Sequence, residues 1–485
     1  MLVSVKWLKD YVDVAANPAE LAERLTMAGL EVDSLHETGP AFSGVRVAKI
    51  VAMQSHPNAD KLVLCNVTTG DASYPVVCGA RNFGVGDLVP LAQVGATLPG
   101  GLVIRSSRIR GEASEGMLCS EEELGIGGDA SGIMILPPDL PLGGELAEVL
   151  ALRDAVLDIG VTPNRADCLS IVGVAREWAA IAGTKLRYPP SDVIETGEDI
   201  QGITSVSILD PDLCPRYTAR VIKNIRIAPS PLWLRRRLEA VGLRPINNIV
   251  DVTNYVMMEL GQPLHAFDFR FLEQGKIVVR RSREGERFVS LDGKERILRS
   301  GTLMICDGVK PVAIGGVMGG FNSEVKEDTE TVLLESAYFN PTSIRRTARE
   351  LGMGTDAAFR FERGVDPEGV IRALDRAARL MADLSGGTVC KGVIDQYPRP
   401  VSTAHDIPLR AARTRDILGV APPEAEIVRI LTGLEMAVRP AGEGRYAVTP
   451  PSCRVDITRE IDLIEEVARL YGFDRVPATV PAVAG

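Results

Sequence analysis

At 485 residues, the chain is well beyond the length over which one hydrophobic core usually grows, so we expect about three or four domains. Apolar residues make up 45% and charged residues 24%, close to globular averages, so nothing in the composition argues for a disordered, a fibrous or a membrane-embedded protein. The formal net charge of -10 on its own argues against a nucleic-acid binder, because phosphate contacts require an excess of Lys and Arg.

The amino terminus and the cysteines indicate the compartment. The opening segment MLVSVKWLKDYVDV carries Lys6, Lys9 and Asp10 and has no long apolar core, so it does not read as a signal peptide. The sequence has no run of about 18 apolar residues, which is the length needed to span a bilayer. The cysteines are far apart, without a C-x-x-C pair or a nearby His. We therefore expect a cytoplasmic protein with reduced thiols.

Positive charge is concentrated in residues 211–250, which hold eight Arg or Lys and two acids, Asp212 and Glu239. Such a cluster is typical of a basic surface that contacts phosphates. A solvated helix face at the RRR run, Arg235 to Arg237, explains it equally well, and the sequence leaves both interpretations open.

The first third of the chain changes its periodicity once. Residues 1–39 read as a helical arm, because Leu21, Leu25, Ala28 and Val32 fall at helical spacing. From Val45 onward, short strand-like runs alternate with turns such as PNAD, TGDAS and LPGG. This spacing predicts a small all-β barrel over residues 40–150.

The remaining two thirds combine helices and strands. Residues 151–205 read as a helix, at about 166–182, and a Pro-containing linker. Residues 206–398 mix strands such as KIVVRR and TVLLESAYF with helices, which predicts a larger α+β domain. Another Pro-rich break precedes a small module at 402–477 that ends in an amphipathic helix, and residues 478–485 read as the beginning of a linker.

The helix that ends the small module carries clustered acids. Ile457, Ile461, Ile464, Ala468 and Tyr471 are spaced as a core stripe. The acids on the other side suit a hard cation such as Mg²⁺, and they are Asp456, Asp462, Glu465 and Glu466. Alternatively, Asp456 caps the helix, the acids favour its positive end, and Glu465 pairs with Arg469.

The middle domain contains several candidate site residues. His265 lies in GQPLHAFD and Glu335 in LLESAYF. The segment AIGGVMGG, residues 313–320, matches neither G-x-G-x-x-G nor the phosphate-loop pattern, which excludes a nucleotide site there. A lone His is more often a structural group than a catalyst, and no Ser-His-Asp arrangement is legible. These residues alone do not establish catalysis.

Longer motifs follow one another along essentially the whole chain. They are VSVKWLKDYV, ELAERLTMAGLEVD, HPNADKL, VVCGARN, GEASEGMLCSEEELG, VTPNRADCLS, INNIVDVTNYVMMELGQPLHAFD, GTDAAFRFERGVDP and EIDLIEEVARLYGFDRVP. In this order they resemble one family, the beta subunit of bacterial phenylalanyl-tRNA synthetase. The resemblance implies a multidomain α+β fold with an oligonucleotide-binding β-barrel at 40–150, an editing domain at 206–398 and a small helix-containing module at 402–477. The barrel itself holds seven basic and twelve acidic residues, so a protein-facing or structural role for it stays open.

The resemblance also implies an activity, the hydrolysis of tyrosyl-tRNA made in error. Tyrosine is phenylalanine plus a hydroxyl, and an apolar pocket rejects an added hydroxyl only about 10²-fold, so a second pocket that accepts the hydroxyl improves fidelity. By the family match Glu335 would accept that hydroxyl, and His265, Thr253 and Asn254 would orient the substrate end and the attacking water. The pocket would be shaped by Gly319, Thr355 and Ala357.

The same resemblance implies cofactors and partners. Asp456, Asp462, Glu465 and Glu466 match the set that the family assigns to a Mg²⁺ shared with the alpha subunit. Adenylation with ATP and transfer would belong to that alpha subunit, and two alpha and two beta subunits form the usual enzyme. Family members continue past Gly485 into a catalytic-like module and a carboxy-terminal RNA-binding module, which leaves this assembly in question.

Three hypotheses follow. The first is a subunit of phenylalanine-tRNA ligase that binds tRNA and hydrolyses misacylated tyrosyl-tRNA. The second is a non-catalytic tRNA-binding or assembly scaffold. The third is a purely structural partner of the alpha subunit.

Overall fold

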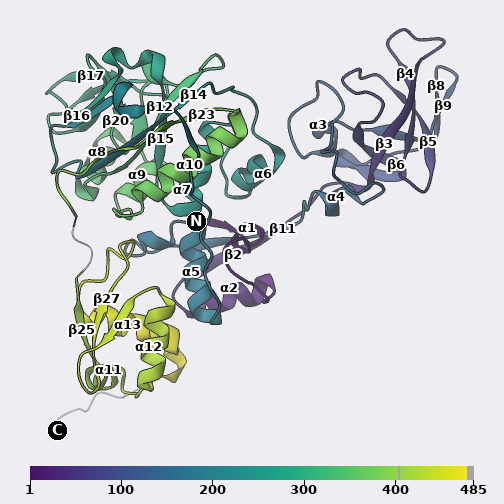
Figure 1. Cartoon of the computed structure of the whole chain (residues 1–485). Helices are drawn as coiled ribbons and strands as arrows, with labels where there is room; N and C mark the ends of the chain where they lie inside the picture. The colour runs from purple at the N-terminus through teal and green to yellow at the C-terminus, as the bar shows by residue number, and fades with distance from the viewer. Residues whose placement is uncertain (402–404, 478–485) are drawn as a thin grey trace. The chain divides into compact units, whose positions relative to one another are not determined.

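The computed structural model describes residues 1–401 and 405–477. These residues form two compact units: His36–Val156 is one, and Met1–Leu35 together with Leu157–Gly485 is the other (Figure 1). The first residues of the predicted small module, 402–404, and the predicted linker 478–485 lie outside the described residues. Within the described ranges, no helix is both long and apolar enough to cross a bilayer.

The unit His36–Val156 is built from antiparallel strands. Its main sheet has the order β10-β6-β3-β4-β5, with β7 beside β6. The strands at the two ends of this order, β10 and β5, lie against each other, so the sheet curves around its core. The elements are β3 (Ser43–Ser55), β4 (Val63–Thr68), β5 (Ser73–Cys78), β6 (Leu88–Leu98), β7 (Leu102–Val103), β8 (Ser107–Ile109), β9 (Glu112–Ser114), β10 (Gly116–Leu118), α3 (Glu121–Leu124) and α4 (Leu146–Val149).

Residues 1–39, predicted as a helical arm, contain strands as well as helices. The structure has β1 (Leu2–Ser4), α1 (Val5–Leu8), α2 (Pro18–Met27) and β2 (Glu31–Thr38). Strands β1 and β2 flank β11 (Asp154–Gly160) in a three-stranded sheet, and α5 (Ile171–Ala182) follows β11 in the chain. The periodicity of the arm cannot show this, because the partner strand lies more than a hundred residues away in the sequence.

Two sheets form the middle of the chain. The first has the order β12-β23-β14-β22-β15, with β24 beside β14, and the second has the order β13-β16-β19-β20-β21. Their strands are β12 (Glu195–Asp199), β13 (Ser205–Ile208), β14 (Arg216–Lys223), β15 (Leu264–Asp268), β16 (Lys276–Arg281), β19 (Leu303–Cys306), β20 (Pro311–Ile314), β21 (Met318–Gly319), β22 (Thr331–Tyr338), β23 (Thr388–Lys391) and β24 (Ile394–Gln396). A separate hairpin joins β17 (Glu286–Val289) to β18 (Glu295–Leu298).

One core fills the space between these two sheets. Tyr217 and Phe267 reach it from the first sheet, and Ile305 and Val312 reach it from the second. The other face of the first sheet carries α10 (Val370–Ser385), which packs on β14 and β22, and α7 (Val250–Leu260), which packs on β15 and α10 (Figure 1). The further helices are α6 (Leu232–Ala240), α8 (Pro341–Leu351) and α9 (Asp356–Phe361).

The small module has a three-stranded sheet with the order β25-β27-β26. Its elements are β25 (Ile407–Arg410), α11 (Ala411–Leu418), α12 (Glu424–Gly433), β26 (Ala437–Pro440), β27 (Arg445–Thr449) and α13 (Glu460–Tyr471). The predicted core stripe of the last helix is partly wrong, since Ile461 is 40% exposed. The helix begins at Glu460, after Ile457, so Leu463, Ile464, Val467 and Ala468 form its buried face instead.

Candidate functional site

His265 and Glu335 lie directly opposite each other on neighbouring antiparallel strands, β15 and β22. Residues in such register have side chains on the same face of a sheet, with Cβ atoms about 5 Å apart. On the other side of β22, Ala219 of β14 is the register partner of Glu335. Two segments seventy residues apart in the sequence therefore bring the imidazole and the carboxyl group together.

The face that carries this pair looks toward the second sheet. Phe267 and Ala337, two residues beyond His265 and Glu335, belong to the core between the sheets. The hydroxyl of Ser336, on the opposite face, donates to the main-chain oxygen of Val370 at the start of α10. Because successive side chains of a strand alternate between faces, Glu335 points away from α10 and into the layer between the sheets.

Gly319 of β21 closes this layer over His265. A Cβ atom at position 319 would lie 2.4 Å from Cε1 and 2.8 Å from Nε2 of His265, and 3.0 Å from Cδ1 of Leu291. The backbone of Gly319 has no positive φ, so the glycine is required for space and not for conformation. The main-chain nitrogen of Leu291 donates to the oxygen of Gly319 at 3.0 Å, which fixes this close approach.

Burial shifts the pKa values of both groups. The side chain of His265 is half-buried, its Nε2 atom is buried without a hydrogen-bond partner among the described residues, and burial lowers its pKa to about 4. Burial raises the pKa of Glu335 to about 7, against the opposing effect of a hydrogen bond from Tyr217. A neutral imidazole and a carboxyl group that titrates near neutral pH can both exchange protons with a ligand.

Thr355 and Ala357 lie at the start of α9. The hydroxyl of Thr355 accepts a hydrogen bond from the main-chain nitrogen of Ala358, which caps the helix, and donates one to the oxygen of Val317 at 2.9 Å. Val317 precedes the strand that carries Gly319, so Thr355 ties α9 to that strand. Ala357 is half-buried and packs against the core between the sheets.

Thr253 and Asn254 lie in α7, on the other side of the first sheet. Thr253 is buried and donates to the main-chain oxygen of Val250, and Asn254 is half-buried. Among the described residues, neither side chain hydrogen-bonds to His265 or Glu335, and no residue of α7 belongs to the core between the sheets. The structure does not bring these two residues together with the pair.

A cavity of about 50 Å³ lies elsewhere, and none of the predicted editing residues lines it. It is bounded by α5, the end of α7 and the start of α10, and its polar lining includes Ser170, Arg176, Gln262 and Arg372.

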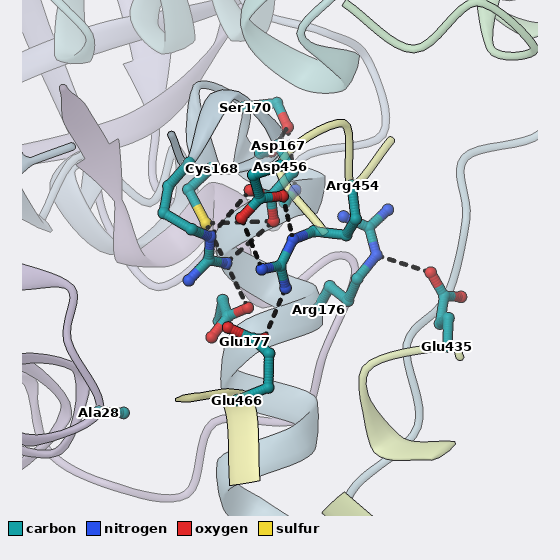
Figure 2. Close-up of polar contacts among 12 residues, drawn as sticks. Ala28, Asp167, Cys168, Ser170, Arg176, Glu177, Glu435, Arg454, Asp456 and Glu466 are labelled. Atoms are coloured by element: carbon teal, nitrogen blue, oxygen red, sulfur yellow. Dashed lines mark hydrogen bonds and ion pairs between the residues drawn. The ribbon is translucent and has the colours of Figure 1, made fainter. Parts of the chain in front are cut away.

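The four acids predicted as metal ligands are not gathered around one point. Glu466 is held by Arg454 and Arg469, and Asp456 forms a two-bond ion pair with Arg454. Burial alone would raise the pKa of Glu466, but hydrogen bonds and charges from these two arginines outweigh it and hold the pKa well below its usual range. Figure 2 shows Arg454 between Asp456 and Glu466.

The other two acids make different contacts. Asp462 accepts hydrogen bonds from the main-chain nitrogens of Thr458 and Arg459 at the start of α13, so it favours the positive end of the helix. Glu465 is exposed. The alternative in which Asp456 caps the helix and Glu465 pairs with Arg469 is wrong, because Arg454 and Glu466 are the partners. As they stand, the four carboxylates do not fit one shared Mg²⁺, and the magnesium site stays a prediction from the resemblance.

Glu466 belongs to a larger buried ion network. The side chain of Glu177 in α5 is fully buried and accepts hydrogen bonds from Arg165 and Arg469, and Arg165 also pairs with Asp167. Asp167, Cys168 and Glu177 are the group of possible metal ligands found within the described ranges, with ligand atoms within 4.8 Å of one another. The guanidinium group of Arg165 contacts all three, so a cation charge is already present there.

The basic segment 211–250 is also used internally. Arg216 and Arg220 are 7% and 5% exposed, and they pair with Asp395 and with Glu195 and Asp375. Neither the phosphate-binding surface nor the solvated helix face describes these two residues. Their acidic partners lie far from them in the sequence, so a count of charges within residues 211–250 does not include these partners.

Three family models match successive segments of the chain. Residues 45–145 match a putative tRNA binding domain, residues 213–386 a B3/4 domain, and residues 407–473 a tRNA synthetase B5 domain. The chain is 66% identical to the phenylalanine–tRNA ligase beta subunit of Syntrophus aciditrophicus over 487 residues, covering 100% of this chain and 60% of that protein.

Other relatives carry the same name. Identity is 53% to the subunit of Geobacter sulfurreducens and 50% to that of Moorella thermoacetica, each covering 99% of this chain and 60% of the relative. The chain thus spans 60% of the length of these curated relatives. Along its whole length, the chain is similar to phenylalanine–tRNA ligase beta subunits.

Proposed function

We propose that this chain is the tRNA-handling and editing part of a phenylalanine–tRNA ligase, a ligase of protein synthesis in the cytoplasm. In this proposal, the middle domain hydrolyses the ester of tyrosyl-tRNA made in error, and the unit His36–Val156 acts as an oligonucleotide-binding barrel that contacts tRNA. Adenylation of phenylalanine with ATP is assigned to an alpha subunit that binds this chain. Two alpha and two beta subunits would form the enzyme.

The observation that carries the editing proposal is the juxtaposition of His265 and Glu335 under Gly319. A tyrosine ring has one polar atom at its far end, and a buried carboxyl group is the acceptor that this hydroxyl needs. Phenylalanine would leave the carboxyl oxygen that Tyr217 does not occupy without a hydrogen-bond partner, and such a loss discriminates strongly. The pair thus offers a physical basis for preferring tyrosyl over phenylalanyl esters.

The imidazole of His265 supplies the group that handles the attacking water. Its low pKa keeps the ring neutral at physiological pH, so the unpartnered Nε2 can accept a proton from an attacking water or hold that water by a hydrogen bond. Gly319 packs closely against Cε1 and Nε2 of His265, and a side chain at that position would collide with the imidazole ring. Thr355 holds the neighbouring strand in place through Val317. No step is assigned to a metal ion.

The proposed tRNA contact of the unit His36–Val156 does not rest on a basic surface. A hollow of about 580 Å³ lies on the unit His36–Val156 along β3, β4, β5 and β9. Its polar lining consists of Gln54, Asn66, Ser73 and the acid Glu112, with no Lys or Arg. Neutral amide and hydroxyl groups suit bases or sugars better than phosphates.

A deacylation assay tests the editing proposal. Tyrosyl-tRNA and phenylalanyl-tRNA, both with the phenylalanine anticodon, are incubated with the chain, with His265→Ala and with Glu335→Ala. We expect the wild type to release tyrosine faster than phenylalanine and both variants to lose at least about 10²-fold in rate on the tyrosyl ester. As a matched control, His405→Ala removes an exposed imidazole from the small module and should keep the wild-type rate. Strong tRNA binding with equal rates for all four proteins would favour the scaffold hypothesis instead.

A further inference from the structure

Glu335 has a second polar neighbour that the motifs do not point to. The hydroxyl of Tyr217 donates to Oε2 of Glu335 at 2.7 Å, and the ring of Tyr217 is fully buried between the two sheets. Tyr217 is opposite Ala337 on β22, two residues from the partner of Ala219, so it approaches Glu335 diagonally across the strands. A ring enclosed on all sides holds its hydroxyl at a fixed point.

The two oxygens of Glu335 are therefore not equivalent. Oε2 is occupied by Tyr217, and Oε1 has no hydrogen-bond partner among the described residues. The residue keeps 7% of its exposure. The carboxyl group is thus anchored at one oxygen and free at the other.

We infer that Tyr217 is a positioning residue of the proposed editing site, which holds Glu335 by one oxygen and leaves Oε1 to accept the hydroxyl of a tyrosyl ester. This inference rests on the proposed function and adds the residue that aims the carboxyl group. Tyr217 does not contact the ester in this scheme. It acts by fixing where, and in which charge state, Glu335 meets the ligand.

The charge state follows from the same hydrogen bond. An O–H donor bonds more strongly to an ionised carboxylate than to a neutral carboxyl group, so Tyr217 favours the ionised form that accepts a phenol hydroxyl. The other titratable groups that face Glu335 are neutral: the imidazole of His265 on β15 and the thiol of Cys214 before β14. The second sheet adds apolar side chains and the Cys306 thiol, whose pKa burial raises to about 11.

A plain packing role for Tyr217 is the competing explanation, since a buried phenol usually finds a partner for its hydroxyl. Tyr217→Phe separates the two, because it removes one oxygen and keeps the ring. Tyr338→Phe is the matched control: Tyr338 is half-buried at the end of β22, packs against the same core, and has no hydrogen bond to Glu335 among the described residues.

The experiment measures kcat/KM for tyrosyl-tRNA and phenylalanyl-tRNA from pH 6 to 9 with the wild-type chain, Tyr217→Phe, Tyr338→Phe, Glu335→Gln and the double variant Tyr217→Phe with Glu335→Gln. For Tyr217→Phe we expect the preference for tyrosyl ester to fall about tenfold near neutral pH and to recover at high pH, with the midpoint of the profile higher by about one pH unit. Glu335→Gln should show no such midpoint, and adding Tyr217→Phe to it should change little. A wild-type ratio and midpoint in Tyr217→Phe would overturn the inference, whatever happens to its melting temperature.

A second measurement keeps this inference separate from the proposed function. Carboxyl-labelled glutamate gives a carbon resonance for Glu335, assigned by its absence in Glu335→Gln, and its titration is followed in the wild type and in Tyr217→Phe. A higher midpoint in Tyr217→Phe supports the control of Glu335 by Tyr217 even if no protein deacylates tRNA, in which case the proposed function alone fails. An unchanged midpoint overturns the inference even if deacylation is fast.

Discussion

Replacing Gly319 by alanine tests the arrangement of the proposed site with a single methyl group. The new Cβ would lie 2.4 Å from Cε1 of His265, whereas carbon atoms in contact are normally about 3.5–4.0 Å apart. The imidazole or the strand must therefore move by roughly 1 Å. The ring cannot turn aside freely, because it packs edge-on against Phe267 with the ring centroids 4.4 Å apart. A displacement of about 1 Å at a reacting group is enough to lower a rate by about 10²-fold.

The assay is single-turnover deacylation of tyrosyl-tRNA by Gly319→Ala, with urea unfolding to measure stability. We expect a rate about 10²-fold below wild type and a loss of about 1–3 kcal/mol in the free energy of unfolding from overpacking. The control is Gly202→Ala, since a Cβ at Gly202 meets no atom within 4 Å and its φ is not positive. A Gly319→Ala protein that is folded and deacylates within a factor of about three of wild type would refute the close approach as the basis of the site.

Three further predictions concern charge. In urea titrations, Glu177→Gln should lower the free energy of unfolding by about 3–5 kcal/mol, because Arg165 and Arg469 lose a fully buried partner. The control is Glu198→Gln, which removes an exposed ion pair with Lys223 and should cost less than about 1 kcal/mol. His265 has a pKa of about 4 in the fold and about 6.5 when unfolded, so its contribution to stability is present above pH 6.5 and is lost as the pH falls toward 4. At about 1.36 kcal/mol per pH unit this contribution is at most about 3.4 kcal/mol. His265→Gln should flatten this part of the stability profile, and an unchanged slope would contradict the assignment. Mg²⁺ titrated into this chain by itself should give equal heats for wild type and Glu465→Gln, since arginines already hold Asp456 and Glu466; a heat that disappears in the variant would show a metal site in the chain alone.

The sequence predicted single elements well where a local pattern determines them. The run KIVVRR is β16, and the helix expected at about 166–182 is α5, which is capped by Gly183 with a positive φ. His265 and Glu335 were singled out through the family match. Their opposition across β15 and β22 is a matter of register between distant strands, which periodicity does not encode.

The polar interior was the part that the sequence could not show. Tyr217 reads as one more aromatic residue of a strand, and only the register of β14 against β22 places its hydroxyl on Glu335. Arg216 and Arg220 read as surface charge, yet their partners at 395 and 375 bury them. Because charged residues are rarely buried, a sequence reading assigns them to the surface unless the partner is near in the chain.

The buried ion network has a consequence for how the protein comes apart. Helix α5 precedes α13 by nearly three hundred residues, yet Glu177 of the first and Arg469 of the second have almost no exposure and neutralise each other. Separation of α13 from α5 would leave a carboxylate and a guanidinium group unpaired in a poorly hydrated interior. We therefore expect amide protons of the two helices to exchange in one cooperative event, and a chain shortened to end before Arg454 to lose the native packing of α5 as well.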